Sequence, residues 1–195
     1  TGGQTCALQI LGDGSYHPLS EKFATLADAK AKYPNATDLE LTDSIDWAAI
    51  YQAGYVAALT GKALFFPAGQ YLVTKTIIKK VVWRGEGSTN AWTSDGRGSI
   101  IKPYGPGNPK RWTDIDGNDL ANFTPMVVAG RSGSSSYDMT LLCESALGRW
   151  SAGLFLPCVR RQFLRNFDVL GDWSDAGLYA AADWSNLNTT LTSLH

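Results

Sequence analysis

Hydrophobic residues at spacings of three and four predict an α-helix that begins near Asp43 and ends at Gly61. Asp43 is the expected N-cap, and Asp46 lies in the first turn, where carboxylates interact favourably with free backbone N–H groups and with the positive end of the helix dipole. Gly61 is the expected left-handed C-cap. One apolar stripe of this helix is expected to be buried, and it consists of Trp47, Ile50, Tyr51, Gly54, Tyr55 and Ala58.

Short apolar runs follow the helix and predict short strands. Few of the connections between them resemble the two-residue Asn-Gly turns of β-hairpins. Short strands with bends between them are typical of a chain that coils as parallel strands, and the preceding helix is then expected to cover the apolar end of the first turn. The expected strands are Ala63–Phe66, Tyr71–Val73, Thr76–Lys79, Val81–Arg84 and Ser99–Lys102, with a turn at Pro67–Gly69.

An internal repeat supports a coil. Residues 153–156 return as residues 177–180 at an offset of 24, and residues 138–142 return as residues 166–170 at an offset of 28. Both offsets suit one turn of a three-sided solenoid. In the second pair, period-two alternation predicts stacked side chains on each side of the strand. The inner row is expected to contain Met139, Leu141, Phe167 and Val169, and the outer row Thr140 and Asp168.

The chain divides into two predicted domains. Residues 1–42 form an N-terminal connector, and residues 43–195 form the start of a parallel β-helix with its capping helix. In the connector, Thr25 and Asp28 predict the capped start of a short helix that stops at Pro34.

Two further segments bear on how much of the protein this chain contains. Residues 103–125 are rich in Pro, Gly, Asn and Asp and are expected to leave the coil as a long loop. The chain starts at Thr1, and residues 185–195 contain no terminating element. We therefore expect a fragment of a longer protein, truncated at its C-terminus.

Composition agrees with an all-β chain and limits the classes of function. The chain is 44% hydrophobic and only 18% charged, with 20 Gly and 7 Trp. A net charge of -1 provides no general attraction for nucleic acid. No apolar run of about 18 residues is present, so membrane insertion is not expected. The cysteines lack metal-ligand spacing and are expected to be buried thiols, and no metal or cofactor is predicted; they are Cys6, Cys143 and Cys158.

Residues 43–87 resemble the start of the pectate-lyase-like β-helix of bacteriophage tailspike and capsular depolymerase proteins. The matching motifs are DWAAI in the helix, FFPAGQYLV in the first strands and RGEG at the end of the next strand, and residues 20–47 are similar to the segment that precedes such a β-helix. The resemblance implies a right-handed parallel β-helix, a homotrimer and attachment to other tail or baseplate proteins of a virion. It also implies binding of bacterial capsule or O-antigen polysaccharide outside the cell.

Three functions stay open at this point. The first is a tailspike segment that recognises a bacterial surface polysaccharide and, in the full protein, degrades it. The second is a secreted, monomeric polysaccharide lyase or hydrolase, because such enzymes share the helix and the FPAG turn. The third is a non-catalytic fibre or adaptor module.

Candidate catalytic residues follow from the chemistry of depolymerases. Glycoside hydrolysis uses two carboxyl groups about 5 to 9.5 Å apart, and lyase chemistry uses a base beside a group that stabilises negative charge. The best local cluster of acids contains Asp168, Asp172 and Asp175. The alternative interpretation is that these are solvated turn carboxylates, with the catalytic acids in segments outside this chain.

Aromatic and basic residues near the same segment are candidates for substrate binding. Tryptophan presents a flat face to a sugar ring, although a tryptophan in a β-helix is at least as often packed under a loop. The candidates are Trp173, Trp184, Arg161 and Arg165, and Trp150 is a further tryptophan of this kind. Residues 114–119 have the sequence DIDGND of a calcium loop, but the glycine comes too early and the closing glutamate is missing, so no metal site is predicted there.

Overall fold

The computed structural model describes residues 11–88, 98–108, 110–113, 119–129, 135–157, 162–181 and 190–194. Three helical elements precede the strands, and a fourth lies between two of them. They are η1 (Leu19–Glu21), α1 (Leu26–Lys32), α2 (Ile45–Thr60) and η2 (Ser145–Leu147). The first seven strands are β1 (Leu64–Phe66), β2 (Gly69–Val73), β3 (Ile77–Lys79), β4 (Trp83–Gly85), β5 (Ser99–Pro103), β6 (Lys110–Thr113) and β7 (Asp119–Phe123). The remaining strands are β8 (Pro125–Ala129), β9 (Ser136–Cys143), β10 (Ala152–Pro157), β11 (Phe163–Gly171), β12 (Ala176–Ala181) and β13 (Thr190–Leu194).

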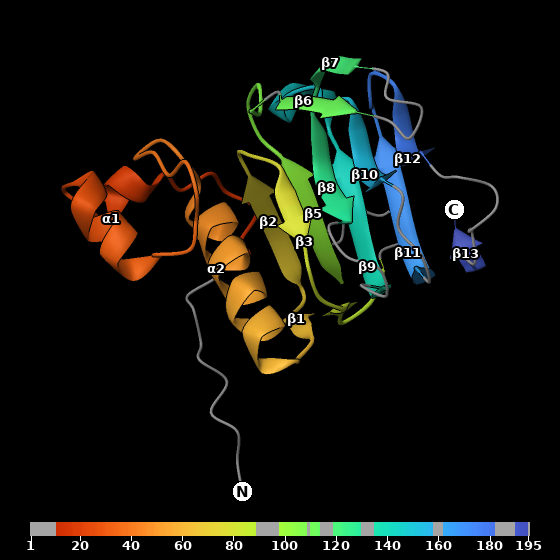
Figure 1. Ribbon diagram of the computed structural model, residues 1–195, viewed down its shortest axis with the longest axis horizontal. Coiled ribbons are helices and arrows are strands. Elements are labelled where there is room, and N and C mark those ends of the chain that lie inside the picture. Colours follow the sequence, from red (N-terminus) through yellow and green to blue (C-terminus); the bar gives the residue numbers. More distant parts are fainter. Residues whose placement is uncertain are drawn as a thin grey trace, which may run out of the picture.

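The strands wind into a coil (Figure 1). One sheet joins β1, β4, β9, β11 and β13 and also holds β2 and β5, and a second sheet joins β3, β8, β10 and β12. All pairs within these two sheets are parallel, and each turn of the chain places its strands beside those of the previous turn. The fold expected from the sequence, a right-handed parallel β-helix preceded by an α-helix, is confirmed.

The observed register reproduces both repeats found in the sequence. Strand β9 pairs with β11 so that Met139 lies beside Phe167, and β10 pairs with β12 so that Leu154 lies beside Leu178. Met139 and Phe167 are buried in the interior of the coil, as expected. On the other side of the same strands Thr140 and Asp168 are also buried, at 0% and 7% exposure. The alternating pattern placed these two side chains on the outer side, but it did not predict that they are shielded from solvent.

Strand β9 bends in its middle and so pairs with two strands of the previous turn, β4 and β5. The bend lies at Asp138, whose φ is 56°, and the equivalent bend of β11 lies at Asn166, whose φ is 46°. The Asn166 amide donates a hydrogen bond of 2.8 Å to Asp138 Oδ1. One turn earlier, a Cβ atom on Gly85 would lie 2.1 Å from the Asp138 carbonyl oxygen, so the close approach of these turns requires glycine there.

Helix α2 starts one residue later than the sequence indicated. Ser44 is the N-cap, and its Oγ accepts a hydrogen bond of 3.0 Å from the backbone N–H of Trp47. The predicted N-cap, Asp43, instead accepts from Lys75 Nζ at 2.8 Å, so its carboxylate is used in a long-range contact and the adjacent hydroxyl caps the helix. Gly61 is the C-cap with a φ of 66°, as predicted.

The first two turns of α2 are buried on all sides. The connector, including α1, lies on one side of α2 and strands β1 to β3 lie on the other (Figure 1). The expected single stripe is therefore wrong for this part of the helix, because the connector covers the face that was expected to meet solvent. The stripe residues of the second half are only partly buried; they are Tyr51, Gly54, Tyr55 and Ala58. The boundary at residue 42 stays a prediction.

The long segment after β5 carries a hairpin rather than an irregular loop alone. Strands β6 and β7 pair antiparallel and lie at one edge of the coil (Figure 1). Phe123, at the end of β7, packs against Phe155 and Tyr179 with ring centroids 5.2 and 5.3 Å apart. This contact covers part of the sheet formed by β8, β10 and β12. Among the described residues, no helix is long and apolar enough to cross a membrane.

Candidate functional site

The three predicted catalytic aspartates have different environments. Asp168 is buried within β11. Asp172 follows β11, and its Oδ1 lies 3.6 Å from Arg149 Nη2 in an exposed ion pair. Asp175 accepts a hydrogen bond of 2.8 Å from the Ser174 hydroxyl. Asp172 follows Asp168 by four positions of largely extended chain, which places their backbones at most about 13 Å apart. Their catalytic roles stay a prediction.

The tryptophans near this segment serve packing in the described structure. Trp173 is half-buried against the main core, and its Nε1 donates to the Leu170 carbonyl at 3.0 Å. Trp150 has no exposed surface, and its Nε1 donates to the Gly105 carbonyl at 2.8 Å, so it presents no face to a ligand. Trp184 and Arg161 lie outside the described residues. The substrate-binding role of Trp173 stays a prediction.

Arg165 belongs to a line of side chains that the sequence did not reveal. It lies beside Tyr137 in the pairing of β11 with β9, Tyr137 lies beside Arg84 in the pairing of β9 with β4, and Arg84 lies beside Phe65 in the pairing of β4 with β1. We call these four residues, Phe65, Arg84, Tyr137 and Arg165, the arginine–aromatic row. Each comes from a successive turn of the coil, so the row runs along the coil axis.

The arginine–aromatic row faces solvent. Phe65 is 52% exposed, both arginines are exposed and Tyr137 is half-buried. The neighbours of these residues along each strand, such as Leu64, Trp83 and Leu164, are buried inside the coil. Since successive side chains of a strand point to opposite faces, the row occupies the outer face. A further exposed aromatic, Phe163 at 44%, lies two residues before Arg165 on the same face of β11.

Both arginines of the row are exposed, and the described residues provide neither with a carboxylate partner. Arg84 lies over the Tyr137 ring, with the guanidinium carbon 5.7 Å from the ring centroid. Within the described ranges no carboxylate forms an ion pair with Arg84 or Arg165. Glu86, two residues after Arg84, accepts a hydrogen bond of 2.7 Å from the Ala68 backbone N–H, and Asp138, beside Tyr137 on β9, accepts from Asn166. Within the described ranges, the row therefore combines two exposed arginines that form no ion pair with one exposed and one half-buried aromatic ring.

One sequence signal pointed toward this row. The repeat that links residues 138–142 with residues 166–170 extends back by one position and pairs Tyr137 with Arg165. Arg84 and Phe65 have no such signal, because insertions of different length separate the earlier turns.

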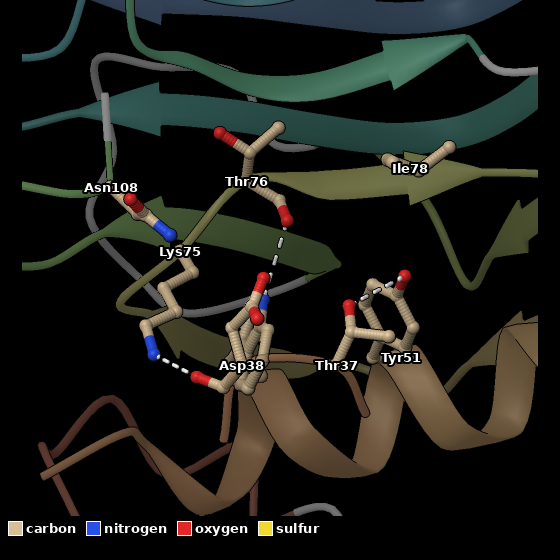
Figure 2. A pocket seen from close by; sticks show the side chains of 8 residues that line it. Thr37, Asp38, Tyr51, Lys75, Thr76, Ile78 and Asn108 are labelled. Atoms are coloured by element: carbon tan, nitrogen blue, oxygen red, sulfur yellow. Dashed lines mark hydrogen bonds between the residues drawn. The ribbon is translucent and has the colours of Figure 1, made fainter. Parts of the chain in front are cut away.

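A second candidate is a shallow hollow between the connector, α2 and the turn after β2 (Figure 2). It is too small to enclose more than about one water molecule, and its lining residues are Thr37, Asp38, Trp47, Tyr51, Lys75, Thr76, Ile78 and Asn108. Its cation, Lys75, already binds the Asp38 carbonyl and the Asp43 carboxylate. Thr37 Oγ1 donates to the Tyr51 hydroxyl at 3.4 Å. These polar groups hold the connector on the coil, which makes the hollow the weaker candidate.

The described residues contain no cluster of three or more His, Cys, Asp or Glu side chains suited to a metal ion. The calcium-like segment lies almost entirely outside the described residues. Cys143 is buried with a free thiol, as expected, and burial raises its pKa. The other two cysteines fall outside the described ranges.

No protein-family model matches this chain, and no curated protein matches it in sequence. Two crystal structures are similar to it. One is the tailspike protein gp49 from Pseudomonas phage LKA1, with 15% sequence identity and a TM-score of 0.46. The other is the tailspike gp61 from Pseudomonas phage phi297, with 17% identity and a TM-score of 0.47. Each match covers 96% of this chain and 50% of the tailspike, so the chain spans about half the length of these proteins.

Proposed function

We propose that this chain is a segment of a phage tailspike that binds a bacterial surface polysaccharide along the arginine–aromatic row. The observation that carries the proposal is the exposure of this row on the outside of a rigid coil. The motifs DWAAI, FFPAGQYLV and RGEG, which resemble those of tailspikes, support the biological setting.

The chemistry of the row suits a polysaccharide. Aromatic rings pack against the apolar faces of sugar rings, and guanidinium groups donate several hydrogen bonds in a planar fork. Neighbouring strands lie about 4.8 Å apart, so four turns extend the row over about 14 Å, which is long enough for a short run of sugars. Because the side chains are mounted on hydrogen-bonded strands, little backbone entropy is lost on binding.

The same proposal covers the full protein. The full protein assembles as a homotrimer, attaches to tail or baseplate proteins and acts outside the cell on capsule or O-antigen polysaccharide. The full protein degrades that polysaccharide, with its carboxyl groups in the segment of Asp168, Asp172 and Asp175 or in further coils.

A non-catalytic module is the second candidate. It is favoured by the burial of Asp168 within β11, where its carboxyl group has little contact with solvent or with a polysaccharide. Release of reducing ends or unsaturated sugars from a bound polysaccharide separates this candidate from an enzyme.

Binding is tested with a panel of purified capsular and O-antigen polysaccharides, half of them neutral and half bearing uronates. We expect the chain to bind at least one of them, and Phe65→Ala to weaken that binding about 10-fold, measured by isothermal titration calorimetry. Leu59→Ala is the matched control, because Leu59 is 73% exposed on α2, outside the row. Absence of binding across the panel, or equal affinities of both variants, would show that the proposal is wrong.

A further inference from the structure

We infer that the arginine–aromatic row selects acidic polysaccharides, with Arg84 and Arg165 pairing with carboxylates on alternate sugars of an extended chain. This inference rests on the proposed function and adds the chemical class of the ligand. It is carried by the spacing of the two arginines, by the ring between them and by the absence of acidic partners for either one within the described residues.

The spacing of the arginines follows from the strand register. Arg84 on β4 and Arg165 on β11 both lie beside Tyr137 on β9, one on each side. Adjacent strands are about 4.8 Å apart, so the two arginine backbones are separated by about 9.6 Å. This distance is of the same order as a disaccharide unit. A chain lying along the row can therefore place the acids of two alternate sugars near the two arginines, with the sugar between them facing the contact of Arg84 with Tyr137.

The charge of the row is local. The whole chain has a net charge of -1, so attraction of an acidic polymer must come from a particular surface and not from the protein as a whole. Arginine and carboxylate form paired, parallel hydrogen bonds that are stronger than those between neutral groups. The Tyr137 ring holds the Arg84 guanidinium in place, which reduces the side-chain entropy lost when an anion binds.

A neutral polysaccharide fits the row less well. Its sugars would cover both guanidinium groups and remove part of their hydration without supplying a counter-charge. A site built to pair with a charged group rejects an analogue that lacks it, because the polar groups of the site are left unpaired. The row therefore discriminates by charge and by spacing along the chain.

The experiment compares each acidic polysaccharide of the panel that binds with the same polymer after chemical reduction of its carboxyl groups to alcohols. We expect carboxyl reduction to weaken binding about 100-fold or more at low salt. Arg84→Gln and Arg165→Gln are each expected to weaken binding of the acidic form about 10-fold and to reduce its salt dependence. Arg149→Gln is the matched control, because Arg149 is exposed and paired with Asp172, and it is expected to change nothing.

The outcomes separate this inference from the proposed function. Equal binding of the native and carboxyl-reduced polymers, or unchanged binding in both row variants, would overturn the inference while leaving polysaccharide binding intact. No binding by any member of the panel would remove the proposed function itself. If Arg84→Gln changes the subunit number in analytical ultracentrifugation but not the affinity, the row is an interface between copies of this chain and the inference is wrong.

Discussion

Replacement of Asp46 by alanine is expected to lower the free energy of unfolding by about 3 kcal/mol. Asp46 is only 3% exposed, in the first turn of α2, and its Oδ1 accepts a hydrogen bond of 2.8 Å from the backbone N–H of Leu11. Burial raises the pKa of Asp46, and the nearby backbone N–H groups of Leu11, Gly12 and Leu72 act to lower it. This side chain thus joins the connector to α2, and alanine leaves the Leu11 N–H without this partner.

The measurement is urea unfolding followed by tryptophan fluorescence. Asp28→Ala is the matched control, because Asp28 is also an acid in the first turn of a helix but is exposed. Its loss is expected to cost about 1 kcal/mol or less. Equal losses in the two variants would mean that Asp46 acts only as a favourable charge at a helix end and does not hold the connector.

Replacement of Lys79 by methionine is expected to raise the free energy of unfolding by about 1 to 4 kcal/mol at pH 7. Lys79 lies at the end of β3 with 2% exposure, and burial lowers its pKa well below the usual value. Its Nζ is 5.9 Å from the centroid of the Trp83 ring, and no carboxylate in the described ranges forms an ion pair with it. Methionine fills a similar volume without the cost of removing an amine from water.

The destabilising effect of the buried Lys79 amine also predicts how the free energy of unfolding changes with pH. In the unfolded chain, Lys79 has the usual lysine pKa of about 10.4. Between the lowered pKa of the folded state and this value, the unfolded state binds more protons than the folded state. The stability of the wild-type chain therefore rises with pH in this window, and the rise is expected to be absent in Lys79→Met. Unfolding is measured from pH 6 to 9, because the pKa of Tyr71, raised to about 12 by burial, opposes the rise only at higher pH. Lys80→Met, at an exposed neighbour, is the control and is expected to give no gain.

Much of the fold was predictable because it depends on local signals that repeat. The strands around Pro67–Gly69, the end of α2 at Gly61 and the offsets of 24 and 28 residues each identified an element or a register that the structure contains. The start of α2 was not predictable, because Asp43 and Ser44 are both good N-caps. The choice depends on Lys75, which lies 32 residues away and occupies the Asp43 carboxylate.

The candidate site was harder to predict because it depends on which residues of neighbouring strands lie beside each other. The row draws Phe65, Arg84, Tyr137 and Arg165 from four strands, and the intervening insertions have no common length. Proximity along the chain instead groups Asp168, Asp172 and Asp175. An extended strand moves residues that are close in sequence far apart in space, and Asp168 is buried within the sheet. Proximity in sequence was therefore a poor guide to a shared site.

The central claim is the register that places the arginine–aromatic row on the outside of the coil, and engineered disulfides test it most directly. In a chain whose three native cysteines are replaced by alanine, Tyr137→Cys with Arg165→Cys is expected to form a disulfide under mild oxidation. Neighbours in parallel strands lie about 4.8 Å apart, within the Cα separation of about 4.4 to 6.8 Å that a disulfide allows. Tyr137→Cys with Leu164→Cys places the thiols on opposite faces and is expected to keep both free. Disulfide formation in the Leu164 pair with free thiols in the Arg165 pair would contradict the register and with it the row.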